Sequence, residues 1–489
     1  MTRLKTHTPI KLSLSRGQTA AAVAALLAAF SLSACTTLPQ SAPFASEPSA
    51  AKKINPIALI NEDAWWNDFG DVQLQGLMVR AFNNSPTLAI AEARVNKAQA
   101  VADQFHAANR PTLGASASAA EAKQSYNYLF GQPGPQSPLP EGYQDFGQVT
   151  LNFNWELDFW GKNRAAIAAA STNALAADAD AAQARLMLAA SVTSAYIELD
   201  RLWQTRDLAE RAVAIRQDSA NLVQQKVSNG VSNQAEYEQA KAGLYAAQSD
   251  LTAVDEQIDL TRHMIATLIG SAPDGADTLK RPQLVPDPKV FGELPTQINL
   301  DLIGRRPDVI AARWRAEAAS AGIKQAHAAF YPNINLAGFV GFQALHIDKL
   351  LSSGSDIGQF GPALSLPLFD GGALKANLKS AEAEHAVAIA SYNQDVLVAM
   401  QQVADTLSSQ KALQARLDTS QKALDAYEDA YRLSKMRYDG GLSNYTTLLI
   451  AEQSLINQRR VVADLKSRAL TLDVALIKAL GGQYTPTNG

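Results

Sequence analysis

The feature that most constrains this chain is a strand-like segment that runs directly into a very long helical segment. In residues 148–158, apolar side chains occupy every odd position and polar side chains the even ones, which is the two-residue period of a β-strand. After Gly161 the pattern becomes helical for about 65 residues, or roughly 100 Å at 1.5 Å per residue. The alternation alone would also suit a soluble β-sandwich. The helical continuation instead predicts a barrel with a lipid-facing outside, extended by a helical tube.

The same junction occurs twice. Gly372 lies 211 positions after Gly161, and the apolar alternation that precedes it, at Pro362, Leu364, Leu366 and Leu368, keeps this offset. Pro307 lies 221 positions after Pro86, because the first repeat carries ten more residues in a proline-rich loop at about 123–144. The chain is therefore expected to be a tandem repeat in which each half contributes one β-hairpin.

The repeats set the expected domain boundaries. Repeat 1 spans 65–283, with a β-hairpin at about 112–159 and a long helical hairpin whose tip lies at about 228–233. Repeat 2 spans 284–482, with a β-hairpin at about 333–369, in which 333–342 pair with 361–369, and a helical tip at about 439–444. Residues 483–489 are expected to form a C-terminal tail.

The N-terminus has the order of an export signal. Basic residues precede an uncharged stretch at 19–34, so 1–34 are predicted to be a signal peptide. The sequence Leu32-Ser33-Ala34-Cys35 resembles the lipobox of bacterial lipoproteins, in which the cysteine is acylated; an ordinary signal peptide or an uncleaved anchor is the alternative. Cys35 is the only cysteine, so no internal disulfide can form. Residues 35–64 are expected to form a lipidated, extended arm.

Charge and hydropathy narrow the functional classes. Removal of the signal peptide would remove four of the 43 basic residues and no acidic residue. The mature chain would then have 39 basic and 47 acidic residues, a net charge of −8, so nucleic acid is not an expected partner. No later segment approaches the roughly 20 apolar residues of a membrane helix, so any spanning structure is expected to be a barrel.

The long helices carry a seam of apolar residues that repeats near every 3.5 positions, as in Leu244, Leu251, Val254 and Ile258, which predicts helices packed side by side. Each helical hairpin reverses at a glycine, Gly230 or Gly441, suited to the left-handed conformation that ends a helix. A following serine or asparagine is expected to cap the next helix.

Four strands cannot close a membrane barrel, and open edges in lipid would leave backbone groups unpaired at several kcal/mol each. Two chains would supply eight strands and a lumen filled by side chains, whereas three would supply twelve and leave a passage. One chain is therefore insufficient.

These residues resemble the TolC-like outer membrane factors, and among them the lipoprotein branch that serves tripartite efflux pumps. The resemblance covers nearly the whole mature chain. It depends on the order of several short segments: Trp65-Trp66 with Phe69 and Asp71; Trp155 to Asp158 with Gly161; Arg305 to Asp308 with Pro332; Pro367 and Phe369 to Gly372; Tyr438 with Gly441; and Ala479 to Gly482.

The resemblance implies a mainly α-helical homotrimer with a twelve-stranded β-barrel in the outer membrane and a twelve-helix α-barrel across the periplasm. It implies a lipid-anchored exit duct that conducts small molecules passively and needs no catalytic residue, cofactor or metal. It also implies that the helical tips dock to a periplasmic adaptor protein and an inner-membrane pump. The tip residues are Asn229, Gly230, Val231, Ser232, Gly440, Gly441, Leu442 and Ser443.

Family members close the periplasmic end with charge pairs and acidic rings. The corresponding candidates are Asp429 and Asp439, paired with Arg432 or Arg437, and a solvated helix end is the alternative. The chain departs from the family pattern at Lys435, where an acid is expected. His106 and His327 occupy equivalent positions, where packing or solvation is favoured over a metal-binding ring.

Two other classes compete with a channel. A non-conducting periplasmic coiled-coil scaffold lipoprotein would share the long helices but would not need the β-hairpins. A surface-anchored hydrolase would need a nucleophile with a base at recognisable spacing, which the sequence lacks, and Glu156 and Asp158 are expected to point into water from the polar strand face.

Overall fold

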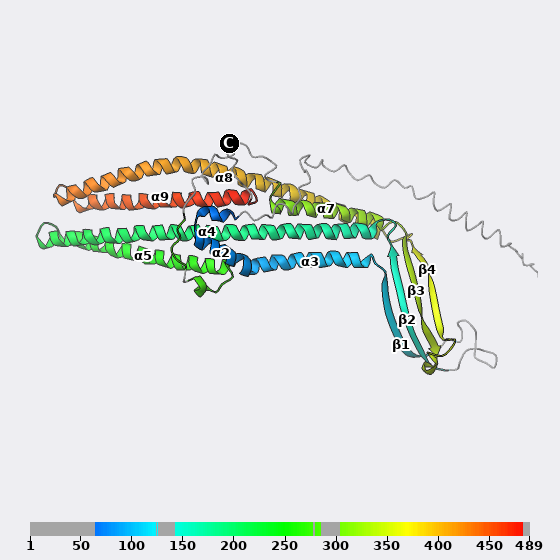
Figure 1. The fold of residues 1–489 in the computed structure, drawn as a ribbon. Coiled ribbons are helices and arrows are strands. Elements are labelled where there is room, and N and C mark those ends of the chain that lie inside the picture. Colours follow the sequence, from blue (N-terminus) through cyan, green and yellow to red (C-terminus); the bar gives the residue numbers. More distant parts are fainter. Residues whose placement is uncertain (1–63, 124, 126–141, 277–278, 285–303, 483–489) are drawn as a thin grey trace, which may run out of the picture. The chain divides into compact units, whose positions relative to one another are not determined.

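The computed structural model describes residues 64–123, 125, 142–276, 279–284 and 304–482 (Figure 1). The expected signal peptide, Cys35, nearly all of the arm at 35–64, and the tail at 483–489 lie outside the described residues.

Four strands form one antiparallel sheet in the order β1-β2-β3-β4. They are β1 (Thr112–Ala122), β2 (Gln144–Leu157), β3 (Asn333–Leu345) and β4 (Asp356–Ser365). The expected hairpins are β1-β2 and β3-β4, and they join because β2 also pairs with β3, with Leu151 opposite Val340. Within the chain, β1 and β4 are the two edges of the sheet (Figure 1).

The predicted alternation of apolar and polar residues is confirmed by the register. Leu113 pairs with Phe153, and the Phe153 ring lies 6.1 Å from that of Phe360 on the same face. The opposite face is polar, since the side chains of Ser116, Thr150 and Asn152 hydrogen-bond to one another there. The sheet therefore has one apolar and one polar face.

The boundaries predicted for β3 and β4 were wrong. β4 begins at Asp356 and ends at Ser365 instead of spanning 361–369, because β3 reaches Leu345 and supplies partners earlier in β4. Asn333 is the first residue of β3 and pairs with Ser365, and Pro332 before it lacks the N–H needed to extend the ladder. Residues 366–369 therefore leave the sheet.

The described residues also contain ten helical segments. They are η2 (Trp65–Phe69), α2 (Val72–Asn84), α3 (Pro86–Ala108), α4 (Lys162–Ser228), α5 (Gln234–Leu268), η3 (Pro273–Ala276), α7 (Pro307–Ala328), η5 (Ile347–Lys349), α8 (Ala373–Asp439) and α9 (Tyr445–Ala479). The predicted helices of about 65 residues are α4 and α8, with 67 residues each. Of the helices in these ranges, none is both long and apolar enough to cross a membrane.

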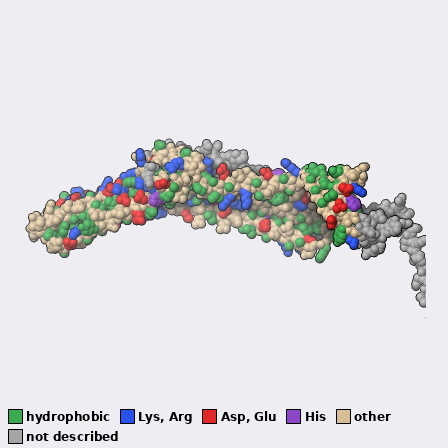
Figure 2. All heavy atoms as spheres, turned by 90° about the horizontal axis from the view of Figure 1, so that it is seen from below, with side chains coloured by type: hydrophobic (Ala, Val, Ile, Leu, Met, Phe, Trp, Pro, Cys, Tyr) green, Lys and Arg blue, Asp and Glu red, His purple; other side chains and the backbone are tan. Residues whose placement is uncertain are grey.

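Helix α4 is the central element of the helical part. It packs against α3, α5, α7 and α9, whereas α8 packs against α7 and α9 (Figure 1). The main core lies where η2 and α2 cover the middle of α4, and Leu74, Met78, Tyr196 and Leu199 are almost fully buried there. The exposed surface in Figure 2 mixes charges of both signs along the helices and gathers hydrophobic side chains at the end that carries the sheet.

A hydrogen bond between Asp71 and Tyr196 fixes the short helix α2 against α4. Asp71 caps α2 by accepting from the Gln73 backbone N–H, and it also accepts from the Tyr196 hydroxyl at 2.7 Å. Burial and this acceptor raise the pKa of Tyr196, so its hydroxyl remains a donor. Ser85 stands at the cap position of α3, where the sequence Ser85-Pro86 would suit a side-chain cap, but it also ends α2 and its buried hydroxyl makes no capping bond.

Candidate functional site

The first helical tip is a tight turn between α4 and α5. Gly230 adopts the left-handed conformation at φ 71°, as predicted, and the Val231 N–H donates to the Lys226 carbonyl at 2.8 Å. The side chain of Asn233 then caps α5 by accepting from the Glu236 N–H at 2.9 Å. The turn therefore satisfies backbone groups at the end of α4 and at the start of α5.

The second tip repeats this geometry between α8 and α9. Gly441 has φ 73°, the Leu442 N–H donates to the Arg437 carbonyl at 2.8 Å, and Asn444 caps α9 through the Thr447 N–H at 3.0 Å. Both capping predictions are thus confirmed.

The tips present matched apolar side chains. Val231 and Leu442 are each 74% exposed at equivalent positions of the two turns. Of the remaining tip residues, Asn229, Gly230, Gly440 and Gly441 are exposed, and Ser232 and Ser443 are half-buried. Each helical hairpin therefore ends in one protruding apolar side chain on a small-residue turn.

The two helical hairpins are joined close to their tips by Lys226 of α4. Its Nζ donates to the Tyr438 carbonyl of α8 at 2.9 Å and lies 3.6 Å from the centre of the Tyr438 ring. The Tyr438 ring lies 5.8 Å from that of Tyr445, and both rings are buried in a small core with Val223 and Leu448. This cation–π contact and core fix the position of one tip relative to the other.

A buried ion pair joins the hairpins further along. Arg216 of α4 and Glu452 of α9 are 3.0 Å apart, and their side chains are 7% and 0% exposed. Arg216 also donates to Gln453, and Ser219 lies 3.5 Å from Glu452. Burial raises the pKa of Glu452, while the positive charge of Arg216 opposes that rise.

The four aperture candidates lie on the last turns of α8. Asp429 pairs with Arg432 at 2.9 Å, as predicted, but both side chains are well exposed. The predicted pairing of Asp439 with Arg432 or Arg437 was wrong, because Asp439 pairs with Lys435 at 3.6 Å, one helical turn away. Arg437 forms no ion pair with a described residue.

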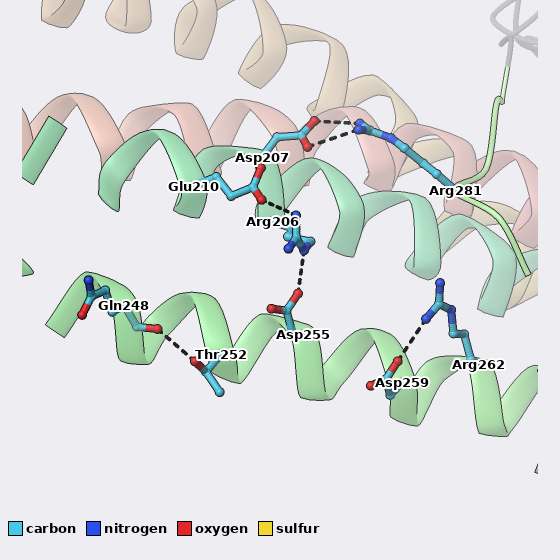
Figure 3. Close-up of polar contacts among 9 residues, drawn as sticks. All are labelled: Arg206, Asp207, Glu210, Gln248, Thr252, Asp255, Asp259, Arg262 and Arg281. Carbon is cyan, nitrogen blue, oxygen red and sulfur yellow. Dashed lines mark hydrogen bonds and ion pairs between the residues drawn. The ribbon is translucent and has the colours of Figure 1, made fainter. Parts of the chain in front are cut away.

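Further ion pairs connect α4 to α5 and to the segment that follows α5. Figure 3 shows Arg206 of α4 between Glu210 and Asp255, and its Nε lies 2.6 Å from the Asp255 carboxylate. Arg281, in the segment that follows α5, pairs with Asp207 of α4 at 2.8 Å (Figure 3). These partly exposed pairs hold the first helical hairpin together.

One buried carboxylate has no positively charged partner among the described residues. Asp473 of α9 is 4% exposed and accepts from the Gln410 side chain of α8 at 3.1 Å, while its second oxygen has no hydrogen-bond partner in the described part of the chain. Burial raises the pKa of Asp473 to about 7.

The sequence prediction did not identify Arg216, Glu452 or Asp473. Each occupies a position where the apolar seam of its helix continues, as in Leu448, Glu452 and Leu455. A charged residue within such a seam is a signal of a buried polar contact.

The prediction that Asp158 points into water from the polar face of β2 was wrong. It lies beyond the end of β2 and accepts from the Arg164 N–H at 2.8 Å, while Glu156 pairs with Lys162. Across the residues that the structure describes, no group of three His, Cys, Asp or Glu side chains is placed to hold a metal. His106 and His327 are therefore not part of such a group.

The comparison with known families identifies the chain. The model of the family described as "Outer membrane efflux protein" matches residues 77–271 and 301–482, which include both helical hairpins and both tips. The chain belongs to the outer membrane efflux protein family. This outer membrane efflux protein is 31% identical over 423 residues to the multidrug resistance outer membrane protein MdtP of Shigella flexneri, covering 86% of each chain.

Solved structures give the same result. The outer membrane protein VceC from Vibrio cholerae is 40% identical, with a TM-score of 0.79 over 86% of this outer membrane efflux protein and 99% of VceC. The outer-membrane channel OprN is 28% identical, also with a TM-score of 0.79, over 92% of this chain and 99% of OprN. The predicted TolC-like resemblance is confirmed.

Proposed function

We propose that this protein is an outer membrane channel that forms the exit duct of a tripartite efflux system and passively conducts small molecules out of the cell. MdtP is named a multidrug resistance outer membrane protein and OprN an outer-membrane channel, which supports this assignment. Passive conduction requires no bond chemistry, and we assign no catalytic residue or cofactor.

The observation that carries the proposal is the sheet. It has one apolar and one polar face, and its outermost strands β1 and β4 have no further strand partner among the residues that the structure describes. Three copies, paired edge to edge, would bury these edges in a twelve-stranded barrel with the apolar face toward lipid. Helices α3 and α7, which lead into β1 and β3, and helices α4 and α8, which follow β2 and β4, give four helices per chain at this level, so three copies would continue the barrel as a twelve-helix tube.

Conductance and assembly test this function together. The purified protein is expected to open long-lived channels in planar bilayers and to migrate as a heat-modifiable trimer on gels. A monomer without conductance would contradict the proposal and favour the non-conducting scaffold instead.

The channel is proposed to be held additionally by a lipid on Cys35. Replacement of Cys35 by serine is expected to abolish incorporation of labelled palmitate, while trimers still form. Incorporation that persists in Cys35→Ser would exclude this anchor.

We further propose that the tips contact a periplasmic adaptor protein, which links the duct to an inner-membrane pump. The equally exposed Val231 and Leu442 support this, since two small-residue turns with one apolar side chain each fit the end of a partner helical hairpin. Val231→Asp with Leu442→Asp is expected to abolish crosslinking to the adaptor and to leave conductance unchanged. Intact crosslinking would contradict the proposed contact.

The periplasmic end is proposed to be closed by charged side chains of α8, namely Asp429, Asp439, Arg432 and Arg437. Like charges brought close together in a narrow ring repel unless they are paired, so such a ring biases the opening. Asp429→Ala with Asp439→Ala is expected to change single-channel conductance. Conductance equal to that of the parent would remove Asp429 and Asp439 from the aperture, and with them the proposed closure by charge pairs.

A further inference from the structure

A cavity of about 600 Å³ lies between the start of α4 and the end of α7. We name it the junction cavity, because it is located where the helices meet the sheet. Its larger lining side chains are Trp160, Arg164, Ile323, Lys324, His327 and Tyr331.

The aromatic wall of the junction cavity is held in place by several contacts. Trp160 stacks on Tyr331 with ring centres 4.8 Å apart and planes 18° from parallel, and its indole N–H donates to the Pro332 carbonyl at 2.8 Å. The His327 ring lies 5.9 Å from that of Tyr331. The wall therefore combines apolar ring faces with polar edges, a combination that favours the boundary between lipid and water.

The remaining wall is cationic. Arg164 is fixed at the cavity by the carboxylate of Asp158, whose side chain is 9% exposed. The carboxylate accepts from the Arg164 backbone N–H at 2.8 Å and from its Nε at 3.3 Å. Lys324 is exposed and forms no ion pair with a described residue, and none of the described lining residues is Asp or Glu. The cavity lies at the N-terminal end of α4 and the C-terminal end of α7, so the two helix dipoles oppose each other there and the charge of the site comes from its side chains.

Exposed apolar side chains lie at the same edge of the sheet. Phe159 follows β2 and is 62% exposed, while Leu368 and Phe369 follow β4 and are 77% and 94% exposed. The register places these strand ends side by side, because Leu157 pairs with Ile334 and Asn333 with Ser365. These apolar side chains therefore lie at the end of the sheet where the cavity is found, and Phe159 directly precedes the lining residue Trp160.

We propose that the junction cavity binds an anionic phospholipid, with its phosphate between Arg164 and Lys324 and its glycerol and upper acyl chains against Trp160 and Tyr331. This inference goes beyond the duct function but rests on the proposed placement of the sheet in the membrane. Guanidinium and ammonium groups are the usual protein partners of phosphate. The aromatic wall and the neighbouring apolar residues favour a lipid over free phosphate.

The tandem repeat provides a matched control. The position equivalent to Trp160 in repeat 2 is Gly371, and that of Arg164 is Lys375, both at an offset of 211. Lys375 is exposed and lies near the start of α8, at the same junction with the sheet, but without an aromatic wall. Replacing Lys375 removes one positive charge at this level and leaves the junction cavity intact.

Native mass spectrometry of the purified protein in detergent, titrated with phosphatidylglycerol or phosphatidylethanolamine of equal chain length, tests the proposal. The parent is expected to retain phosphatidylglycerol at a concentration roughly tenfold lower than phosphatidylethanolamine. Arg164→Gln with Lys324→Gln is expected to remove this preference, Trp160→Ala to weaken retention of both lipids, and Lys375→Gln to preserve the parent behaviour.

Equal retention of both lipids by the parent would overturn the proposal, as would an equal loss of preference in Lys375→Gln. Displacement of phosphatidylglycerol by excess inorganic phosphate would also overturn it, because the cavity would then be a general phosphate site. Unchanged heat-modifiable migration of the variants shows that they are folded. Single-channel conductance separates the two proposals, because a conducting parent without lipid preference refutes only the lipid site.

Discussion

The buried carboxylate of Asp473 makes the stability of this channel depend on pH in an unusual direction. Most carboxylates that are paired in a fold stabilise it at neutral pH and destabilise it in acid. Within the described part of the chain, Asp473 has only the Gln410 amide as a partner, and burial raises its pKa to about 7 from an ordinary value of 3.8. The fold therefore favours the protonated form, whose stabilising contribution is complete below about pH 4 and is lost as the pH rises to about 7.

The magnitude follows from this difference in pKa. Each pKa unit corresponds to about 1.4 kcal/mol, so ionisation of Asp473 costs about 4 kcal/mol of unfolding free energy at pH 8 and about 2 kcal/mol at pH 5. Asp473→Asn keeps an acceptor for Gln410 and removes the cost. In a chain of 489 residues, about 1 kcal/mol shifts the melting temperature by about 1 °C. We therefore expect the variant to melt about 4 °C above the parent at pH 8 and about 2 °C above it at pH 5.

Loss of the circular dichroism signal of the helices on heating, at both pH values, measures this shift. Asp464→Asn is the control, because Asp464 lies on the same helix but its side chain is 56% exposed, so a change below about 1 °C is expected at either pH. If Asp473→Asn melts at or below the parent temperature at pH 8, or if its gain in melting temperature is the same at both pH values, burial does not raise the pKa of Asp473.

Two further predictions concern packing and the backbone. Glu452→Ala is expected to cost about 3–5 kcal/mol in chemical unfolding, because it leaves Arg216 buried without a counter-charge, whereas Glu452→Leu with Arg216→Met recovers most of the loss; equal losses would show that the ion pair is not the cause. Gly270→Ala places a Cβ 2.2 Å from the Asn84 carbonyl oxygen at φ 69°, so it is expected to unfold about 2 kcal/mol more easily than Gly230→Ala, whose Cβ meets open space at φ 71°. Similar midpoints for the two alanine variants would contradict the clash.

Sequence periodicity was sufficient to predict the elements of this fold. The two-residue alternation before Gly161 and the seam spacing near 3.5 residues predicted the strands and the long helices, because both patterns depend only on which face of an element is buried. The tips were predictable for a similar reason. Gly230 and Gly441 are the residues at the two helix ends that adopt a left-handed conformation at no steric cost.

The strand ends and polar pairings were less predictable. β4 ends at Ser365 because Pro332 stops its partner strand, and an alternation that continues through Leu368 does not contain this information. Asp439 pairs with Lys435 instead of Arg437, because helical geometry brings the side chain four positions earlier within reach.

By itself, the sequence determined the tandem repeat, the presence of the two β-hairpins, the length of the two long helices, and the family to which the chain belongs, since each follows from local pattern along the chain. Only the tertiary structure decided which polar groups of one repeat lie against those of the other, Arg216 on Glu452 and Lys226 on Tyr438, and that Asp473 lies against an uncharged amide of its own repeat. The physical reason is that burial and pairing depend on which helix faces become neighbours. That choice is made by packing across more than 200 residues of intervening chain for the first two contacts, and the spacing within any one helix does not encode it.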